Sequence, residues 1–141
     1  MRLMLLLLAG AGALALLAAC SRSQNPDAGK GAAVDLAAQP LTAPWQGPYG
    51  GGPPFDAIKV ADFEPVMTAA MAAQLAEIDA IAANPEPPTF ENTIAALERT
   101  GQPLKRAFTA YGIWSSNMNS PEFQKVDEVL SPRFAEFSDK I

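Results

Sequence analysis

Histidine is absent from this sequence of 141 residues, and that absence restricts its possible chemistry more than any other feature. Catalytic zinc is normally held by histidine ligands, and general acid–base catalysis near neutral pH usually uses a histidine side chain. The chain by itself offers neither kind of site. We therefore expect no catalytic residue and no metal-binding residue within it.

Cysteine and basic residues are also scarce. One cysteine is present, which excludes an internal disulfide. Lys and Arg number 10 against 15 Asp and Glu, for a net charge of −5. Because the basic residues form no cluster, we expect no binding to nucleic acid.

The N-terminus has the pattern of a bacterial lipoprotein signal peptide. Arg2 supplies a short positive region, Leu3 to Leu17 form an apolar run, and small residues follow. The sequence Leu-Ala-Ala-Cys ending at Cys20 matches the lipobox, in which the cysteine sulfur is acylated before cleavage. We predict a signal peptide over 1–19 and lipidation of Cys20. The alternative is an uncleaved membrane anchor, but the apolar run is short for one.

Lipidation predicts a location in the bacterial cell envelope. Several acyl chains on Cys20 would anchor the protein stably to a membrane, facing the periplasm. Ser21 follows the cysteine, where Asp commonly retains a lipoprotein in the inner membrane, so the outer membrane is favoured. Residues 20–40 are rich in turn and linker residues and lack an apolar period, so we expect a disordered tether.

Residues 41–62 combine prolines and glycines with large aromatic side chains. The prolines fix φ and the glycines interrupt regular structure, while Trp45, Tyr49 and Phe55 are too apolar for a free linker. We expect an extended strap whose aromatic side chains insert into a larger body. Gly50, Gly51 and Gly52 are not followed by the residues of a phosphate-binding loop, so a nucleotide site is not expected.

Residues 63–141 predict an all-α segment of about four helices. Asp62 is a candidate N-cap for a first helix, which carries an apolar stripe and ends near Asn84. Thr89 caps a second helix, which Gly101 can close in the left-handed conformation.

A third helix is predicted from Pro103, and Ser120 caps a fourth, in which Pro132 should cause a kink. The apolar period of this fourth helix continues to Ile141, so we expect the segment to be truncated at its C-terminus.

Several clusters of chemically capable residues have simpler structural explanations. Glu91 and Glu98 could share one helix face, but paired surface carboxylates usually serve as solvated charges. The same holds for Glu77 and Asp79, which are two residues apart. Met67 and Met71 are interpreted as core residues, and Tyr111 and Trp114 as core or interface aromatics. Asp127, Glu128 and Asp139 lack the residue spacing of a calcium-binding loop.

Several sequence motifs of this chain resemble those of a known family. The phrases PWQGPYGG, PPFD, EIDAIAANP and PTFENTIAALE, followed by a helix after the glycine and a Ser-Pro-Glu cap, occur in that order from Leu41 to Ile141. They are similar to the N-terminal region of zinc metallopeptidases of the thimet oligopeptidase type, which include oligopeptidase A and bacterial peptidyl-dipeptidase. The resemblance covers the N-terminal portion of these enzymes only.

This resemblance implies a mostly helical enzyme with a deep channel that cleaves short peptides. Its zinc would be held by an HExxH helix and a further Glu, none of which occurs here, so no catalytic residue transfers to this chain. We expect the chain alone to be inactive and to bind no zinc. The alternative is a small helical lipoprotein that acts as a periplasmic binding or scaffolding module.

Overall fold

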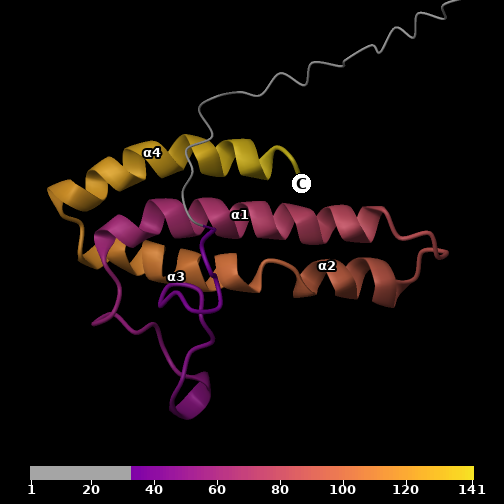
Figure 1. Cartoon of the computed structure of the whole chain (residues 1–141), viewed down its shortest axis with the longest axis horizontal. Helices are drawn as coiled ribbons and strands as arrows, with labels where there is room; N and C mark the ends of the chain where they lie inside the picture. The colour runs from indigo at the N-terminus through magenta and orange to yellow at the C-terminus, as the bar shows by residue number, and fades with distance from the viewer. Residues whose placement is uncertain (1–32) are drawn as a thin grey trace, which may run out of the picture. The chain divides into compact units, whose positions relative to one another are not determined.

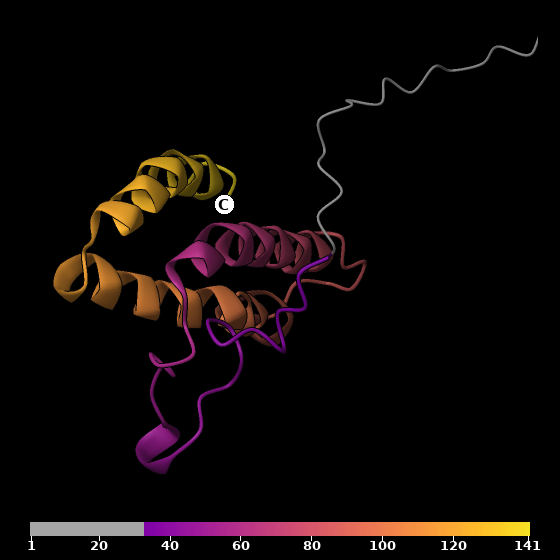
Figure 2. The ribbon, with the colours of Figure 1, turned by 60° about the vertical axis from the view of Figure 1, so that its left-hand side comes forward.

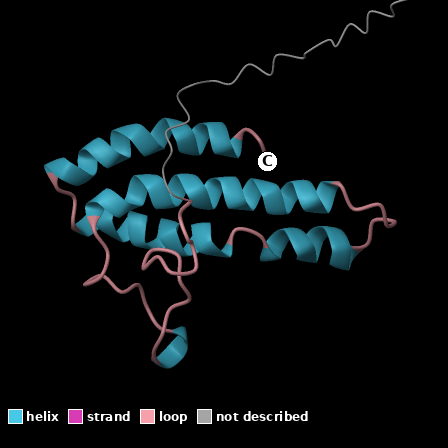
Figure 3. Ribbon diagram, in the orientation of Figure 1, coloured by secondary structure: helices cyan, strands magenta, loops and turns pink. Residues whose placement is uncertain are grey.

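A computed structural model describes residues 33–141 of the chain. The predicted signal peptide, Cys20 and most of the predicted tether lie outside the described residues. The described part is helical and contains no strand, which confirms the all-α prediction (Figure 3). Its elements are η1 (Pro48–Gly50), α1 (Val60–Ala82), η2 (Phe90–Ala95), α2 (Ala96–Arg99), α3 (Gln102–Asn117) and α4 (Pro121–Ser138).

The long helix α1 organises the described residues. η2, α2 and α3 follow one another back along α1, and α4 then turns and runs beside α1 again (Figures 1 and 2). α1 packs against both α3 and α4, which also contact each other. α2 lies beside the C-terminal part of α1, beyond the end of α4 (Figure 1).

The core lies where α1, α3 and α4 meet. Phe63 is fully buried, and its ring lies 5.3 Å from the rings of both Trp114 and Phe123, in edge-to-face geometry. Such aromatic pairs stabilise beyond their buried area. The other buried apolar side chains of the helices are Val66, Met67, Ala70, Met71, Leu104, Ala107, Ala110 and Leu130. The predictions of Met67, Met71 and Trp114 as core residues are confirmed.

α1 begins slightly earlier than the sequence predicts. Its N-cap is Lys59, and Asp62 is the third residue of the first turn rather than the cap. The Asp62 carboxylate still serves the helix start, because it accepts a hydrogen bond of 3.2 Å from the Lys59 N–H. A carboxylate there also opposes the positive end of the helix dipole.

The cap predictions at the other helix starts are confirmed. The Thr89 hydroxyl accepts from the Asn92 N–H at 3.1 Å, and the Ser120 hydroxyl accepts from the Phe123 N–H at 3.2 Å. α4 continues through Pro132 as one helix. α3 begins at Gln102, one residue before the predicted start, and reaches Asn117.

The segment before α1 contacts the core at several points. Leu41 and Thr42 are buried, and the Thr42 carbonyl accepts a 2.6 Å hydrogen bond from Nε of Arg106 on α3. Phe55 stacks at a tilt on Trp114, with ring centroids 6.1 Å apart. Tyr49, by contrast, is fully exposed and has a positive φ of 58°. Tyr49 therefore does not insert into the core of the described residues, and its insertion into a larger body stays a prediction.

Candidate functional site

The two ends of α1 differ in how well they are covered. Between Phe63 and Met71 the helix contributes five buried side chains, and it contributes none afterwards. η2 and α2, which lie beside this later part, also have no buried residue. We call residues 74–82 of α1 together with η2 and α2 the open half, and the core around Phe63 the closed half.

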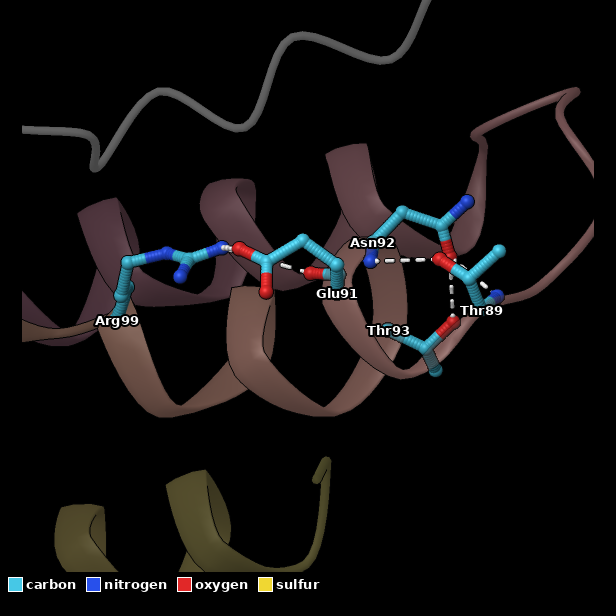
Figure 4. A network of polar contacts seen from close by, with 5 residues as sticks. All are labelled: Thr89, Glu91, Asn92, Thr93 and Arg99. Carbon is cyan, nitrogen blue, oxygen red and sulfur yellow. Dashed lines mark hydrogen bonds and ion pairs between the residues drawn. The ribbon is translucent and has the colours of Figure 1, made fainter.

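The start of η2 is fixed by a small polar network (Figure 4). The Thr89 N–H donates to Oδ1 of Asn92 at 2.7 Å, while the Asn92 N–H donates back to the Thr89 hydroxyl. The Asn92 side-chain NH₂ donates to the carbonyl of Pro87 at 2.9 Å, and the Thr93 hydroxyl donates to Oδ1 of Asn92. This reciprocal capping satisfies donors that a helix start otherwise leaves free.

A charged pair spans the turns that follow. Nη2 of Arg99 lies 2.7 Å from Oε1 of Glu91, and both side chains are largely exposed (Figure 4). Glu91 lies in η2, which is wound as a π-helix of six residues, and Arg99 is the last residue of α2. An exposed pair of this kind contributes little to stability. Glu91 is therefore the ion-pair partner of Arg99.

The joint between α2 and α3 is tied to α1 through Gly101. Gly101 has a left-handed φ of 66°, as predicted for this position. Its N–H donates a 2.7 Å hydrogen bond to Oε2 of Glu77, and a Cβ on Gly101 would overlap the Gln74 side chain. The interpretation of Glu77 as only a solvated charge is thus wrong, because it accepts a tertiary hydrogen bond.

An apolar flank runs along the open half. It consists of Phe90, Ile94 and Leu97, whose spacing places them on one side of the helical segment, and their exposed fractions are 73%, 49% and 41%. Beside it lies a groove of about 470 Å³ between α1 and η2, lined by Ile78, Ile81 and Leu97 among others. Adjacent apolar side chains with this exposure are typical of a surface that packs against another element.

Tyr111 and Asp127 join α3 to α4 in the closed half. The Tyr111 hydroxyl donates to Oδ1 of Asp127, which also accepts from the Ser131 hydroxyl at 3.2 Å. Burial, followed by the hydrogen bond to Asp127 and its negative charge, raises the pKa of the Tyr111 phenol well above its usual range. Tyr111 is therefore a neutral, half-buried structural donor, which agrees with its interpretation as a core or interface aromatic.

The described residues do not fit the zinc site that the family resemblance implies. From 33 to 141, no group of three or more His, Cys, Asp or Glu side chains is arranged to hold a metal ion. The acidic residues considered for calcium, Asp127, Glu128 and Asp139, are not brought together, and Asp127 is instead a hydrogen-bond acceptor for Tyr111. Within the same residues, no helix is long and apolar enough to cross a membrane.

Sequence reasoning missed the partnership between Glu77 and Gly101. The turn at Gly101 has a local signal, since glycine tolerates positive φ, but its partner lies 24 residues earlier on another helix. The apolar flank does have a local signal, because Ile94 and Leu97 are three residues apart and so share a helix face. Its exposure depends on which neighbours reach it, and the local sequence carries no signal for that.

Comparison with curated proteins finds similarity to peptidases. Over 89 residues, or 63% of this chain, it is 37% identical to the dipeptidyl carboxypeptidase of Escherichia coli (strain K12). It is 33% identical over the same length to the dipeptidyl carboxypeptidase of Salmonella typhimurium (strain LT2), and 33% identical over 86 residues to oligopeptidase A of that organism. No protein-family model matches the chain.

The chain spans about 13% of the length of these relatives. The matches support the peptidase family that the sequence motifs indicated, over a short part of each relative. Across its matched residues, this chain is thus similar to part of the dipeptidyl carboxypeptidases and the oligopeptidase A of these bacteria.

Proposed function

We propose that this chain is the N-terminal helical segment of a lipid-anchored zinc metallopeptidase that cleaves short peptides, and that its role there is structural. The observation that carries this proposal is the 37% identity to dipeptidyl carboxypeptidase over a match that covers 13% of that enzyme. The catalytic residues would lie in other parts of a longer protein, because this sequence contains no histidine. The segment would help to wall the substrate channel.

The mass of the native protein tests this proposal directly. The protein is recovered from membranes of the source organism with an antibody against residues 84–101 and weighed by mass spectrometry. We expect a species several times heavier than 14.8 kDa, with zinc-dependent activity toward short peptides. A species close to the mass of residues 20–141 plus the lipid would overturn the proposal.

Activity assays separate the chain from the longer protein. We expect no peptide hydrolysis by the chain alone, with or without added zinc. Zinc-dependent release of dipeptides by this chain would contradict the structural role proposed for it.

Membrane attachment is a separate part of the proposal. We infer acylation of Cys20, which would place the protein in the bacterial cell envelope, facing the periplasm and favouring the outer membrane. Radiolabelled palmitate should be incorporated into the protein and lost in Cys20→Ala. Label that survives this substitution would exclude Cys20 as the acylated residue.

A second candidate function is a small helical lipoprotein that binds a periplasmic partner. The closed half favours it, because Phe63, Trp114 and Phe123 already form an aromatic core within the described residues. A cooperative unfolding transition of a monomeric chain, together with a native mass near that of the lipidated chain, would support this function over the peptidase.

A further inference from the structure

The open half contains an apolar surface that no described residue covers. Phe90, Ile94 and Leu97 form the apolar flank, and their spacing of four and three residues is that of a helix-packing stripe. α4 approaches this flank only at its end, where Phe137 and Leu97 line the same shallow pocket. The flank therefore continues beyond the helix that covers the closed half.

The rim of this surface carries more acidic than basic side chains. Glu86 lines the groove beside the flank, and Glu98 lines the shallow pocket at its other end together with Lys105. Between Val60 and Glu98 the sequence contains no Lys or Arg, and Arg99 is already paired with Glu91. A partner for the flank would therefore meet apolar side chains bordered by Glu86 on one side and by Glu98, with Lys105 next to it, on the other.

A second copy of this chain is a poor occupant on these grounds. In a two-fold dimer the same surface contacts itself, so Glu86 and Glu98 would face like charges across the interface. A helix with an apolar stripe edged by Lys or Arg complements both the apolar flank and its rim. The match covers 13% of the curated relative, and the remainder is ample chain to supply such a helix.

We propose that the apolar flank of Phe90, Ile94 and Leu97 seats a basic-edged amphipathic helix from another part of the same longer peptidase chain. This rests on the proposed function, since the occupant belongs to the longer protein. The flank is thus an internal interface that joins the open half to the remainder of the enzyme, and Glu86 and Glu98 orient the seated helix.

The test measures whether the flank is covered in the native protein. Phe90→Cys and Ile94→Cys are introduced separately, both into the gene in its source organism and into the 141-residue chain produced alone. Each protein is treated with a water-soluble maleimide, and labelling of the peptide that carries the new thiol is followed by mass spectrometry. The chain alone serves as the matched control, and unfolded samples give the intrinsic reactivity.

We expect both thiols to react at least tenfold more slowly in a native protein several times heavier than the chain than in the chain alone. Equal labelling rates in that heavy species would overturn the inference and leave the proposed function standing. A native species of chain size would overturn both. Protection in the chain alone that grows with its concentration would assign the flank to a second copy and overturn the inference.

A charge at the centre of the flank gives an independent measurement. Ile94→Glu should lower the melting temperature of the heavy native species by several degrees and leave that of the chain alone nearly unchanged, because the side chain is half exposed there. Glu98→Gln, at the rim, should give a smaller decrease. An equal effect of Ile94→Glu on both proteins would show a local helix effect and contradict the interface.

Discussion

The closed and open halves of the helical segment are built from the same α1 helix but differ in their cover. In the closed half, Phe63 and Met67 are buried completely between α3 and α4. In the open half, η2 and α2 are held by helix caps and by two tertiary hydrogen bonds at their end, from Gly101 to Glu77 and from Gln74 to Thr100, and they bury no side chain. Polar contacts thus define the shape of the open half, whereas apolar burial stabilises the closed half.

This difference follows from the magnitudes involved. A fully buried Phe or Met side chain contributes about 1.5–3 kcal/mol through removal from water. A helix cap contributes about 1 kcal/mol, and an exposed ion pair such as Glu91–Arg99 contributes less. The closed half should therefore dominate the free energy of unfolding of the chain, and the open half should open first.

The largest difference between the two halves is expected for a pair of matched phenylalanine substitutions. Phe63→Ala should lower the free energy of unfolding by about 3–5 kcal/mol, because it leaves a cavity among Tyr111, Trp114 and Phe123. Phe90→Ala removes the same side chain from the open half, where it is 73% exposed, and should change the free energy by less than about 0.5 kcal/mol. Denaturant unfolding of residues 21–141 measures both.

Equal losses in the two variants would break the distinction between the halves. A large loss for Phe90→Ala would mean that the flank is buried in the chain alone. Phe63→Leu, which retains most of the apolar volume, should lose less than Phe63→Ala and confirm that the cavity causes the effect.

Much of this fold can be predicted from the sequence because its signals are local. Thr89, Ser120 and Gly101 each mark a helix boundary through chemistry that acts within a few residues. The apolar period of α1 likewise predicts a buried stripe, but it continues through Ile78 and Ile81, which are only partly covered. Which part of a stripe is buried depends on the length and direction of neighbouring helices, and that information is tertiary.

The limits of the sequence prediction are similar for the candidate site. Hydrogen bonds such as Gly101 to Glu77 and Arg106 to Thr42 connect residues far apart in the chain, where no periodicity predicts them. The exposure of Tyr49 also depends on tertiary neighbours, since aromatic character alone favoured burial. The absence of histidine, in contrast, restricts the chemistry of the chain without any structural information.

The joint between the halves is tested by a pair of glycine substitutions. Gly101→Ala places a Cβ at positive φ and against the Gln74 side chain, so we expect a loss of about 2 kcal/mol or more in the free energy of unfolding. Gly112→Ala is the matched control, because it lies within α3 with open space around it. It should stabilise the chain by up to about 1 kcal/mol.

The steric and conformational parts of the Gly101 effect can be separated. The double variant Gln74→Ala, Gly101→Ala removes the overlap but retains the unfavourable φ, so it should recover only part of the loss. Full recovery would show that backbone conformation at the joint is unimportant, and no recovery would show that Gln74 simply moves aside.

The hydrogen bond between Tyr111 of α3 and Asp127 of α4 makes the stability of the closed half depend on pH. The folded-state pKa of Tyr111 is raised above its ordinary value near 10, first by burial and then by Asp127. Above pH 10 the unfolded chain loses this proton while the folded chain keeps it, so the unfolded state binds fewer protons and stability falls as pH rises. The stabilisation is complete below pH 10 and is lost as the pH approaches the folded-state pKa.

Tyr111→Phe should remove this dependence. Near neutral pH the variant should be about 1.5 kcal/mol less stable, because it loses a hydrogen bond to a carboxylate. Its deficit relative to the original chain should shrink between pH 10 and 11, as measured by denaturant unfolding at each pH. Asp127→Asn should retain part of the dependence, because burial is the larger cause of the raised pKa. A deficit that stays constant with pH would contradict this assignment.

The smallest effect comes from matched cap substitutions in the two halves. Ser120→Ala removes the cap of α4, whose first turn inserts the buried Phe123, and should cost about 1 kcal/mol of global stability. Thr89→Ala removes an equivalent hydrogen bond from η2, which buries no side chain.

Because the open half opens locally before the core unfolds, the loss in Thr89→Ala should appear as faster amide hydrogen exchange over 90–99, with a much smaller change in global stability. Equal global losses at Thr89 and Ser120 would mean that the two halves unfold as one unit, and that cap chemistry alone, independent of the burial behind it, sets the stability of each helix.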